Sequence, residues 1–396
     1  MTTNNNVIKM TDLDLSDKKV LIRVDLNVPL EDGKVVSDQR IVAALQTIRL
    51  ATSGGGRVIL LSHLGRPEEG IFSEKYSLAP IALHLSTLLD VEVRFISEWL
   101  DGVEVAQGEV VLCENVRFNV GEINNSRELS KRMAALADIF VMDAFGAAHR
   151  AQASTEGVAR YAPVACGGSL LIKELDALSR SLRAPKRPLV AIVGGSKVST
   201  KLRLLDSLSS VVDHLILGGG IVNTFIAAAG HKIGKSMHEG ELVPKARRLL
   251  NEAEKRNTNI PLPFDVVVAK TCTASAETAV KTLNEISDDD LILDIGPKTA
   301  LNFADMIRAA GTVVWNGPVG VFELPPFSGG TRELAAAVGE SQAFSIVGGG
   351  DTLAAVEAFN VTDKISYLST GGGAFLEYLE GRTLPAVAIL EERATS

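Results

Sequence analysis

Short runs of apolar residues, many of them β-branched, recur along the whole chain and alternate with longer segments of mixed polarity. The short runs are apolar at successive positions, which is typical of strands buried on both faces of a parallel sheet. In the first half of the chain we expect strands at residues 20–24, 58–61, 91–95, 110–112 and 139–142. In the second half we expect them at residues 189–193, 214–217, 265–268, 291–295, 312–315, 345–347 and 365–368.

The longer segments have the spacing of amphipathic helices. Residues 127–136 and 244–255, for example, return apolar side chains every three or four positions and keep charged residues between them. Strands that alternate with such helices predict an α/β fold built from doubly wound, Rossmann-like parallel sheets. Because the predicted strands are many for a single sheet, we expect two domains.

The boundary between the two domains is predicted within residues 172–188. Residues 173–182 (KELDALSRSL) have the pattern of one helix, and Pro185 and Pro188 then precede the first strand of the second half. We therefore expect a first domain at residues 1–170, a joining helix and linker at 171–187, and a second domain at 188–378.

Composition excludes several classes of protein. The 396 residues carry a formal net charge of −8, with 46% hydrophobic and 22% charged residues, which is the balance of a globular chain. A general nucleic-acid binder needs surplus Lys and Arg, so nucleic acid is not an expected partner. Cys113, Cys166 and Cys272 are far apart and odd in number, which argues for reduced thiols and against a disulfide framework or a zinc ligand set.

No segment has the pattern of an export signal or a membrane span. The first 19 residues are polar, and the most apolar stretch, residues 215–230, is interrupted by three consecutive glycines and an Asn. We expect a cytoplasmic protein without a membrane partner.

The residues that follow the predicted strands carry the chemistry, because open α/β sheets bind ligands at the carboxyl ends of their strands. In the first half these ends are rich in Arg and His: DLNVP at residues 25–29, SHLGRP at 62–67, ENVR at 114–117 and DAFGAAHR at 143–150. The guanidinium group of Arg binds phosphate or carboxylate through two parallel hydrogen bonds. The first domain is therefore predicted to bind a small, multiply charged acid.

The strand ends of the second half are rich in Gly instead: GGSK at residues 194–197, GGG at 218–220, GP at 296–297, NGP at 316–318, GGGDT at 348–352 and GGG at 371–373. Glycine lets backbone N–H groups approach an anion closely, and the N-terminus of a following helix adds partial positive charge. This pattern predicts a nucleotide site. A reaction that joins the two ligands is phosphoryl transfer across a cleft between the domains.

Each of these signals has a structural alternative when it is taken alone. A single Gly-rich turn after a strand is often only a tight connection, and a single Arg there is often a solvated surface residue. His63 and His149 could belong to the core or cap a turn, and Asp25 and Asn27 could cap a helix or a turn. Repetition of the signals at several strand ends favours the functional interpretation.

Lys197 and Lys201 are four positions apart, so we expect them to share one face of the helix that follows the strand at 189–193. Like charges at this spacing repel each other unless an anion lies between them, and a pair of exposed surface lysines is the alternative.

Two other motifs fail on context. GHKIGKS at residues 230–236 lacks the first Gly of a Walker A loop, and no acidic residue ends the second strand of this half, as a nicotinamide site would require.

These strand-end segments, in this order, resemble the phosphoglycerate kinase family over essentially the whole chain. The resemblance rests on RVDLNVP at residues 23–29, SHLGRP at 62–67, ENVRF at 114–118, DAFGAAHRA at 143–151, GGSKVSTK at 194–201, WNGPVGVFE at 315–323, GGGDT at 348–352 and STGGGA at 369–374. Each motif alone is modestly specific, whereas the set is highly specific.

The resemblance implies two lobes that are joined by a helix and face each other across a cleft. It implies a glycolytic enzyme that moves a phosphoryl group between 1,3-bisphosphoglycerate and ADP to give 3-phosphoglycerate and ATP. It also implies Mg²⁺ as cofactor, a monomer, and a C-terminal tail at residues 379–396 that returns to the first lobe.

Carried over residue by residue, the resemblance implies the following roles. The residues that would bind the phosphoglycerate substrate are Asp25, Leu26, Asn27, Arg40, His63, Leu64, Gly65, Arg66, Arg117 and Arg150. Those that would bind the nucleotide are Lys201, Asn316, Glu323, Gly349, Gly350, Asp351 and Thr352, with Asp351 also binding Mg²⁺. Those that would surround the phosphoryl group in transfer are Arg40, Lys197 and the backbone amides of Gly372 and Gly373.

Three positions depart from the family pattern. Gln152 stands where a His is common, Gln46 lies in the helix after Arg40 where the family often begins a P-T-I run, and Leu171 replaces a frequent Met. None of them is a charged position of the motifs, so we expect effects on local packing only.

Two other functions compete with the kinase. One is a two-lobed binding protein that holds a phosphorylated acid without catalysis, and the other is an oxidoreductase of the same fold class. The first usually needs an export signal, and the second needs the acidic residue that the second half lacks. The kinase is therefore the favoured function.

Overall fold

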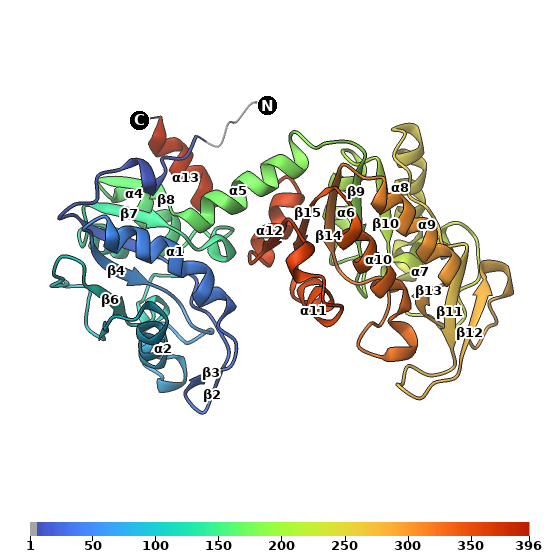
Figure 1. Ribbon diagram of the computed structural model, residues 1–396, viewed down its shortest axis with the longest axis horizontal. Helices are drawn as coiled ribbons and strands as arrows, with labels where there is room; N and C mark the ends of the chain where they lie inside the picture. The colour runs from blue at the N-terminus through green and yellow to red at the C-terminus, as the bar shows by residue number, and fades with distance from the viewer. Residues whose placement is uncertain (1–5, 396) are drawn as a thin grey trace. The chain divides into compact units, whose positions relative to one another are not determined.

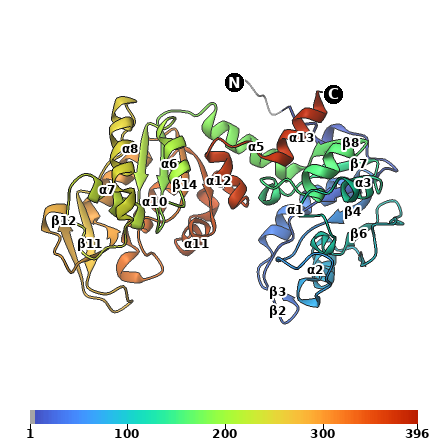
Figure 2. The ribbon, with the colours of Figure 1, turned by 180° about the vertical axis from the view of Figure 1, so that it is seen from behind.

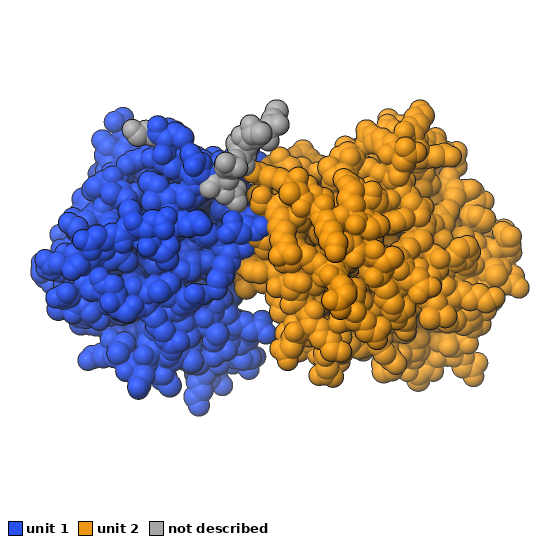
Figure 3. Space-filling model, turned by 45° about the horizontal axis from the view of Figure 1, so that its top comes forward, with its two compact units in different colours: residues 1–176, 383–396 blue, residues 177–382 orange. Residues whose placement is uncertain are grey.

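The computed structural model describes residues 6–395 and divides the chain into two compact units. Unit 1 runs to Asp176 and takes up the chain again at Thr383, and unit 2 runs from Ala177 to Arg382 (Figure 3). Each unit is built around a parallel sheet of its own, as the sequence predicts.

Unit 1 contains a six-stranded sheet in the order β5-β6-β4-β1-β7-β8, with every neighbouring pair parallel. Its strands are β1 (Lys19–Arg23), β4 (Arg57–Leu61), β5 (Val93–Ile96), β6 (Val110–Cys113), β7 (Ile139–Met142) and β8 (Val164–Gly167). The five strands predicted for this half are confirmed with small shifts at their ends. The pattern missed β8, because its sequence VACG contains one β-branched residue and is too short to stand out.

Helices cover both faces of this sheet (Figures 1 and 2). They are α1 (Gln39–Ser53), α2 (Ala79–Leu89), α3 (Arg127–Ala134), α4 (Val158–Tyr161) and α13 (Pro385–Ala394). Ile41 and Ile48 of α1 join Ile22, Leu60 and Val141 of the strands in one fully buried core. The short pieces β2 (Leu30–Glu31) and β3 (Lys34–Val35) form a hairpin just before α1.

The C-terminal helix α13 packs against α4 and β8 of unit 1, beside which both ribbon views show it (Figures 1 and 2). The guanidinium group of Arg393 donates hydrogen bonds to the backbone carbonyls of Arg160 (2.8 Å) and Ala162 (3.0 Å). Near the other end of the helix, the backbone N–H of Ala386 donates to the carbonyl of Ala148. The last helix of the chain is therefore part of the first unit.

Unit 2 contains a five-stranded parallel sheet in the order β10-β9-β14-β15-β16. Its strands are β9 (Leu189–Val193), β10 (His214–Leu217), β14 (Thr312–Asn316), β15 (Phe344–Gly348) and β16 (Tyr367–Ser369). From β9 the chain continues to β10, which lies toward one edge of the sheet, and from β14 it continues to β15, which lies toward the opposite edge. Such a reversal opens a crevice at the carboxyl ends of β9 and β14.

Two of the strands predicted as parallel form a separate antiparallel sheet. β11 (Asp265–Ala269) pairs with β12 (Thr278–Thr282) on one side and with β13 (Leu291–Ile295) on the other. The prediction of parallel pairing was wrong for β11 and β13 because an apolar run does not encode the direction of a strand. The strand β12 was missed because its TAVKT sequence is largely exposed.

The helix that links the two halves, α5 (Ser169–Leu182), begins earlier than the predicted start at residue 173. The remaining helices of unit 2 are α6 (Leu202–Ser209), α7 (Gly219–Ala228), α8 (Val243–Lys255), α9 (Pro297–Arg308), α10 (Gly329–Glu340), α11 (Gly350–Ala358) and α12 (Gly373–Leu379). Over residues 6–395, no helix combines the length and the apolar character needed to cross a bilayer.

Candidate functional site

Three arginines from three strand ends of unit 1 gather around one pocket. Arg66 follows β4, Arg117 follows β6 and Arg150 follows β7, and all three line a cavity of about 400 Å³. Pro67, Ile123, Ala151 and Gln152 complete its wall. The carboxyl ends of parallel strands meet at one edge of the sheet, which is why residues far apart in sequence come together here. We call this cavity the arginine pocket.

Arg117 is the most enclosed of the three, with a relative exposure of 5%. One of its terminal nitrogens donates to the carbonyl oxygen of Gly65, and its Nε is buried without a hydrogen-bond partner in the described part of the chain. Burial, followed by the positive charge of Arg150, lowers its pKa to about 10. The group therefore remains cationic at neutral pH and has hydrogen-bonding capacity to spare for an anion.

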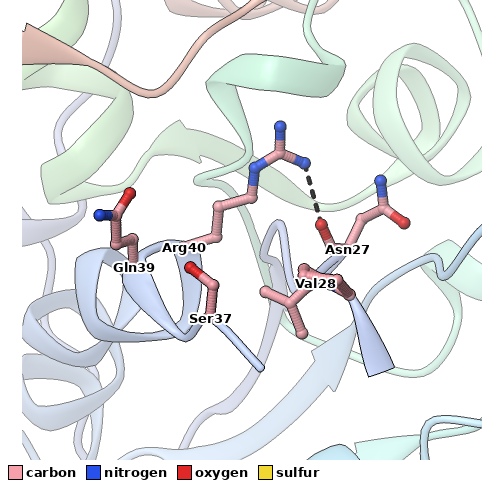
Figure 4. A pocket seen from close by; sticks show the side chains of 6 residues that line it. Asn27, Val28, Ser37, Gln39 and Arg40 are labelled. Carbon is pink, nitrogen blue, oxygen red and sulfur yellow. Dashed lines mark hydrogen bonds between the residues drawn. The ribbon is translucent and has the colours of Figure 1, made fainter. Parts of the chain in front are cut away.

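A second pocket of about 430 Å³ lies beside Arg40, in the first turn of α1, and is lined by Asn27, Val28, Pro29, Ser37, Gln39 and Arg40. Figure 4 shows the guanidinium group of Arg40 reaching the backbone carbonyl of Asn27, at 3.0 Å. The same guanidinium lies 3.4 Å from the Asp25 carboxylate. The side-chain oxygen of Asn27 accepts from the N–H of Gly65 at 2.8 Å. These bonds tie the loop after β1 to the loop after β4.

The rest of the predicted substrate set is buried behind these loops. Leu26 is fully buried, and its backbone N–H donates to Ser62. Leu64 is also buried, and its carbonyl accepts from the amide of Asn115 at 2.8 Å. His63 is 6% exposed, and its Nδ1 lies 3.1 Å from Nη2 of Arg23.

Arg23 belongs to the motif at residues 23–29, and its pattern did not predict a role for its side chain. It is the last residue of β1 and is completely buried. A signal was present, since an arginine that ends an otherwise apolar strand, two positions before Asp25, is unusual for a buried strand. The pattern alone could not say whether the side chain turns inward or out to solvent.

The position of Gln152 corrects the expectation that this departure from the family pattern affects local packing only. This residue lines the arginine pocket together with the three arginines and is 5% exposed. Its replacement of a common His therefore alters the wall of the pocket and not only local packing. Gln46, another departure from the pattern, accepts a hydrogen bond from Lys173 on α5 at 2.5 Å.

In unit 2, Lys201 joins the ends of two neighbouring strands. Its Nζ donates to the carbonyl of Gly194 after β9 (2.5 Å) and to the side-chain oxygen of Asn316 at the end of β14 (2.6 Å). Burial lowers the pKa of Lys201 to about 8, against the attraction of Asp351, which raises it. Its charge is held by neutral oxygens at the crevice between β9 and β14.

The end of β15 is tied to the same place. The amide nitrogen of Asn316 donates to the carbonyl of Gly348 at 2.6 Å, and the buried hydroxyl of Thr352 accepts from the N–H of Gly317 at 2.7 Å. Lys201, Asn316 and Thr352 thus form one hydrogen-bonded group over three strand ends.

Lys197 and Lys201 do not share a helix face, and that prediction was wrong. α6 begins only at Leu202, so both lysines precede it, Lys201 in a turn and Lys197 in the irregular segment before that turn. Lys201 folds back onto the strand ends, whereas Lys197 is exposed. The GGSK sequence that opens this segment disfavours helix because glycine is a poor helix former.

The glycines of unit 2 fall into two kinds. A Cβ on Gly194 would lie 1.7 Å from the carbonyl oxygen of Pro318, and one on Gly218 would lie 2.3 Å from Cα of Val319. These two glycines are needed for close packing of backbone on backbone. At Gly350 and Gly372, in contrast, a Cβ would meet nothing within 4 Å, so their backbone is open to a ligand.

The open glycines lie at helix N-termini. Gly349 is the N-cap of α11, which begins at Gly350 and has Asp351 exposed in its first turn, and Gly372 is the N-cap of α12, which begins at Gly373. Glu323 is exposed in the segment that follows β14. The donors that the two helix N-termini offer are backbone N–H groups, and at α11 the carboxylate of Asp351 lies in the same first turn.

The donor groups around Asp351 fit a Mg²⁺ ion that is held together with substrate phosphates. Within residues 6–395 no group of three or more His, Cys, Asp or Glu side chains could enclose a metal ion. Mg²⁺ is commonly held by one or two carboxylates together with substrate phosphates. A single exposed carboxylate therefore fits an ion that arrives with a nucleotide and does not fit an all-protein metal site.

Comparison with known proteins gives consistent matches over nearly the whole chain. Residues 10–382 match the family model described as phosphoglycerate kinase. A solved structure of phosphoglycerate kinase from Coxiella burnetii is 56% identical, with a TM-score of 0.96, and the match covers 98% of this chain and 100% of that one. Phosphoglycerate kinase from Pyrococcus horikoshii OT3 is 32% identical, with a TM-score of 0.81, and the match covers 98% of this chain and 99% of that one.

Proposed function

The chain belongs to the phosphoglycerate kinase family, and on this premise we propose how its residues divide the work of the reaction. The protein is a phosphotransferase of glycolysis that moves a phosphoryl group between 1,3-bisphosphoglycerate and ADP to give 3-phosphoglycerate and ATP. The matches name enzymes, and they do not favour a binding protein without catalysis.

The arginine pocket is the proposed site for the phosphate group of the glycerate substrate. The observation that carries this proposal is the meeting of Arg66, Arg117 and Arg150 from separate strand ends around one cavity. Cations this close repel one another unless an anion lies among them. A phosphate with two negative charges and three acceptor oxygens suits such a set of guanidinium groups.

Arg40 and the loop after β1 are the proposed site for the carboxylate end of the same substrate. Asn27 lines the pocket beside Arg40, and the carboxylate of Asp25, 3.4 Å from the guanidinium group of Arg40, is the polar group proposed to contact a substrate hydroxyl. Gly65, held by Asn27, fixes this loop next to the arginine pocket. One small acid with a phosphate at one end could thus contact both pockets.

Lys201, Asn316 and Thr352 are the proposed anchor for the nucleotide phosphates, with the N–H groups of Gly349 and Gly350 as additional donors. Helix N-termini carry partial positive charge and bind phosphate without any side chain. Glu323 is the proposed acceptor for the ribose hydroxyls. We assign Mg²⁺ to Asp351, where the ion would compensate charge on the phosphate oxygens.

Phosphoryl transfer between two anions requires positioning and charge compensation rather than a general base. The acceptor oxygen of ADP and the leaving carboxylate of the glycerate are already ionised, so no proton has to move. Arg40, Lys197 and the backbone N–H groups of Gly372 and Gly373 are proposed to surround the phosphoryl group in flight. Exclusion of water at that moment protects the acyl phosphate from hydrolysis.

Closure of the two units about α5 is proposed to bring these groups together, because Arg40 belongs to unit 1 and Lys197 to unit 2. We propose in addition that the protein acts as a cytoplasmic monomer. The domain roles follow the same division, with the acid in the first unit and the nucleotide in the second.

A coupled assay with 3-phosphoglycerate, ATP and Mg²⁺ tests this assignment. Lys197→Ala is expected to lower kcat by about a hundredfold or more while each KM changes by about threefold or less, since this group acts in the transition state. Arg40→Ala should lower kcat similarly and also raise the KM for 3-phosphoglycerate, because Arg40 is proposed to bind the substrate carboxylate as well. Arg132→Ala, an exposed arginine paired with Asp101, serves as the control and should leave both constants unchanged. Losses confined to KM would contradict the transition-state role.

A further inference from the structure

We propose that Arg23 positions His63 for substrate binding by holding its imidazole ring in the neutral tautomer that carries the proton on Nε2. The proposal rests on the proposed function only in assigning His63 to the substrate site. Arg23 itself is a positioning residue, because it acts through His63 and not through the substrate.

The register of the sheet brings the two residues together. Arg23 ends β1 and pairs with Leu61, the last residue of β4, and His63 follows two positions later. Nη2 of Arg23 lies 3.1 Å from Nδ1 of His63, which is a hydrogen-bond distance. A guanidinium nitrogen can only donate, so Nδ1 has to accept. In a neutral imidazole the proton must then be on Nε2.

The guanidinium group of Arg23 is itself held rigidly. It is fully buried, its Nε donates to the hydroxyl of Ser154 at 3.0 Å, and its Nη1 donates to the carbonyl of Val24 at 2.5 Å. Ser154 links Arg23 to Glu122, because its hydroxyl donates to the buried carboxylate of Glu122 at 2.5 Å. The backbone N–H of Ser154 donates to the other Glu122 oxygen at 2.9 Å.

The chain from Glu122 through Ser154 to Arg23 explains how a fully buried cation is tolerated. A buried charge needs both hydrogen bonds and a counter-charge. Glu122 supplies the counter-charge one hydroxyl away, and Asp25 adds a second negative charge near Arg23. We call this hydrogen-bonded chain the brace. Ser154 lies in the helical turn that follows Gln152, and Gln152 lines the arginine pocket, so the brace lies next to that pocket.

The charges that face His63 oppose its protonation. Burial lowers the pKa of His63 well below its ordinary value, and the positive charges of Arg23, Arg117, Arg150 and Arg40 lower it further. A proton on Nδ1 would also point at an N–H group of Arg23. His63 therefore presents one fixed donor, Nε2–H, to an oxygen of the acid, and the arginines supply the charge.

The tautomer can be observed directly in the complete, substrate-free protein. Long-range ¹H–¹⁵N correlation spectra distinguish a protonated Nε2 from a protonated Nδ1, and His63→Gln assigns the signal. We expect the Nε2–H form throughout the range from about pH 5.5 to about pH 8.5. In Arg23→Met we expect mixed tautomers of His63 and a KM for 3-phosphoglycerate that rises about tenfold.

A second variant keeps the proposal testable where Arg23→Met fails to fold. Ser154→Ala removes the brace and keeps Arg23, so the same changes are expected with a KM increase of about threefold. Arg132→Met is the matched control and should alter neither the spectrum nor KM. A wild-type His63 protonated on Nδ1, or one that titrates near neutral pH, would overturn the proposal, as would a folded Arg23→Met with unchanged tautomer and KM.

Failure of this inference differs from failure of the proposed function. An active enzyme whose His63 carries its proton on Nδ1 refutes the role of Arg23 and leaves the kinase assignment intact. An inactive protein with a protonated Nε2 refutes the assignment of His63 to a substrate site, and with it the functional half of the inference.

Discussion

The buried cations Arg23 and Lys201 are stabilised in different ways. In unit 1 the buried guanidinium of Arg23 is balanced by the carboxylate of Glu122 through a hydroxyl group. In unit 2 the ammonium group of Lys201 is surrounded by carbonyl and amide oxygens, which carry no net charge. Neutral oxygens replace only part of the hydration of an ammonium ion, and the pKa of Lys201 is accordingly lowered to about 8.

This lowered pKa predicts how nucleotide binding depends on pH. Below about pH 8 Lys201 is charged and attracts phosphate, and above it the free protein must take up a proton in order to bind. We expect the Kd for ATP, measured by titration calorimetry, to rise about tenfold between about pH 7 and about pH 9.5. Lys201→Arg should remove this dependence because arginine stays charged.

Lys201→Met provides the second comparison. It should bind ATP weakly at every pH, since it never carries the charge. A wild-type affinity that stays constant up to the ordinary lysine pKa of 10.5 would show that Lys201 is not the group responsible.

At the scale of elements, buried aspartates fix the start of several helices. Asp143 accepts hydrogen bonds from the N–H groups of Leu170 (2.9 Å) and Leu171 (3.2 Å) at the beginning of α5. Asp294 accepts from Gly330 at the beginning of α10, and Asp265 accepts from Thr299 in α9. The cap on α5 comes from Asp143, the residue after β7 and distant in sequence, which is why the pattern of apolar positions placed the helix start too late.

Asp143 predicts a dependence of stability on pH. Burial raises its pKa to about 7, whereas the unfolded carboxyl has a pKa near 3.8. The native state therefore binds more protons between these values, and the stability that the neutral form contributes is lost as pH rises toward about 7. Asp143→Asn keeps the accepting oxygen and removes the charge. At about pH 8 we expect it to be more stable than wild type by about 1 to 3 kcal/mol.

Urea unfolding followed by circular dichroism, at about pH 5 and about pH 8, measures this difference. The gain should shrink at the lower pH, where Asp143 of the wild type is itself neutral. Asp143→Ala, which also removes the cap, should be destabilised at both values by about 1 kcal/mol or more. An Asn variant less stable than wild type at about pH 8 would mean that the ionised carboxylate is needed at this position.

The two kinds of glycine predict opposite outcomes for the same substitution. Gly194→Ala places a methyl group on the carbonyl of Pro318, so we expect a loss of stability of about 2 kcal/mol or more. Gly350→Ala meets nothing and lies in the first turn of α11, so stability should be unchanged or slightly higher. Its effect should instead be a higher KM for ATP, measured in the coupled assay. A destabilised but fully active Gly350→Ala would contradict the proposed ligand contact.

Much of the fold could be predicted from the sequence because parallel strands leave long apolar runs. What the runs could not supply was direction, so β11 and β13 were assigned to the wrong kind of sheet. At the site, the motifs identified the arginines that share a pocket, since strand ends in a parallel sheet meet at one edge. Glu122 and Ser154 escaped notice because their role depends on burial, which sequence spacing does not report.

At the scale of the whole molecule, the chain distributes the proposed reaction over two separately folded units. The groups proposed to hold the acid lie in unit 1, and those proposed to hold the nucleotide lie in unit 2. The chain passes from one to the other within α5 and returns just after Arg382. Each unit has its own buried core, so either can keep its structure while the connection between them bends.

This division predicts that the protein changes its dimensions only when both ligands are bound. In the proposed mechanism the phosphoryl group contacts Arg40 from unit 1 and Lys197 from unit 2 in the same step, so neither ligand alone should draw the units together. We expect the radius of gyration from small-angle X-ray scattering to fall with 3-phosphoglycerate and ATP together, and to stay near the free value with either one. Arg40→Ala should bind ATP normally and show a smaller decrease with both ligands, because one of the two contacts that favour closure is missing. An unchanged radius in the wild-type ternary complex would require that transfer occur without closure, and the assignment of Arg40 and Lys197 to one phosphoryl group would then be wrong.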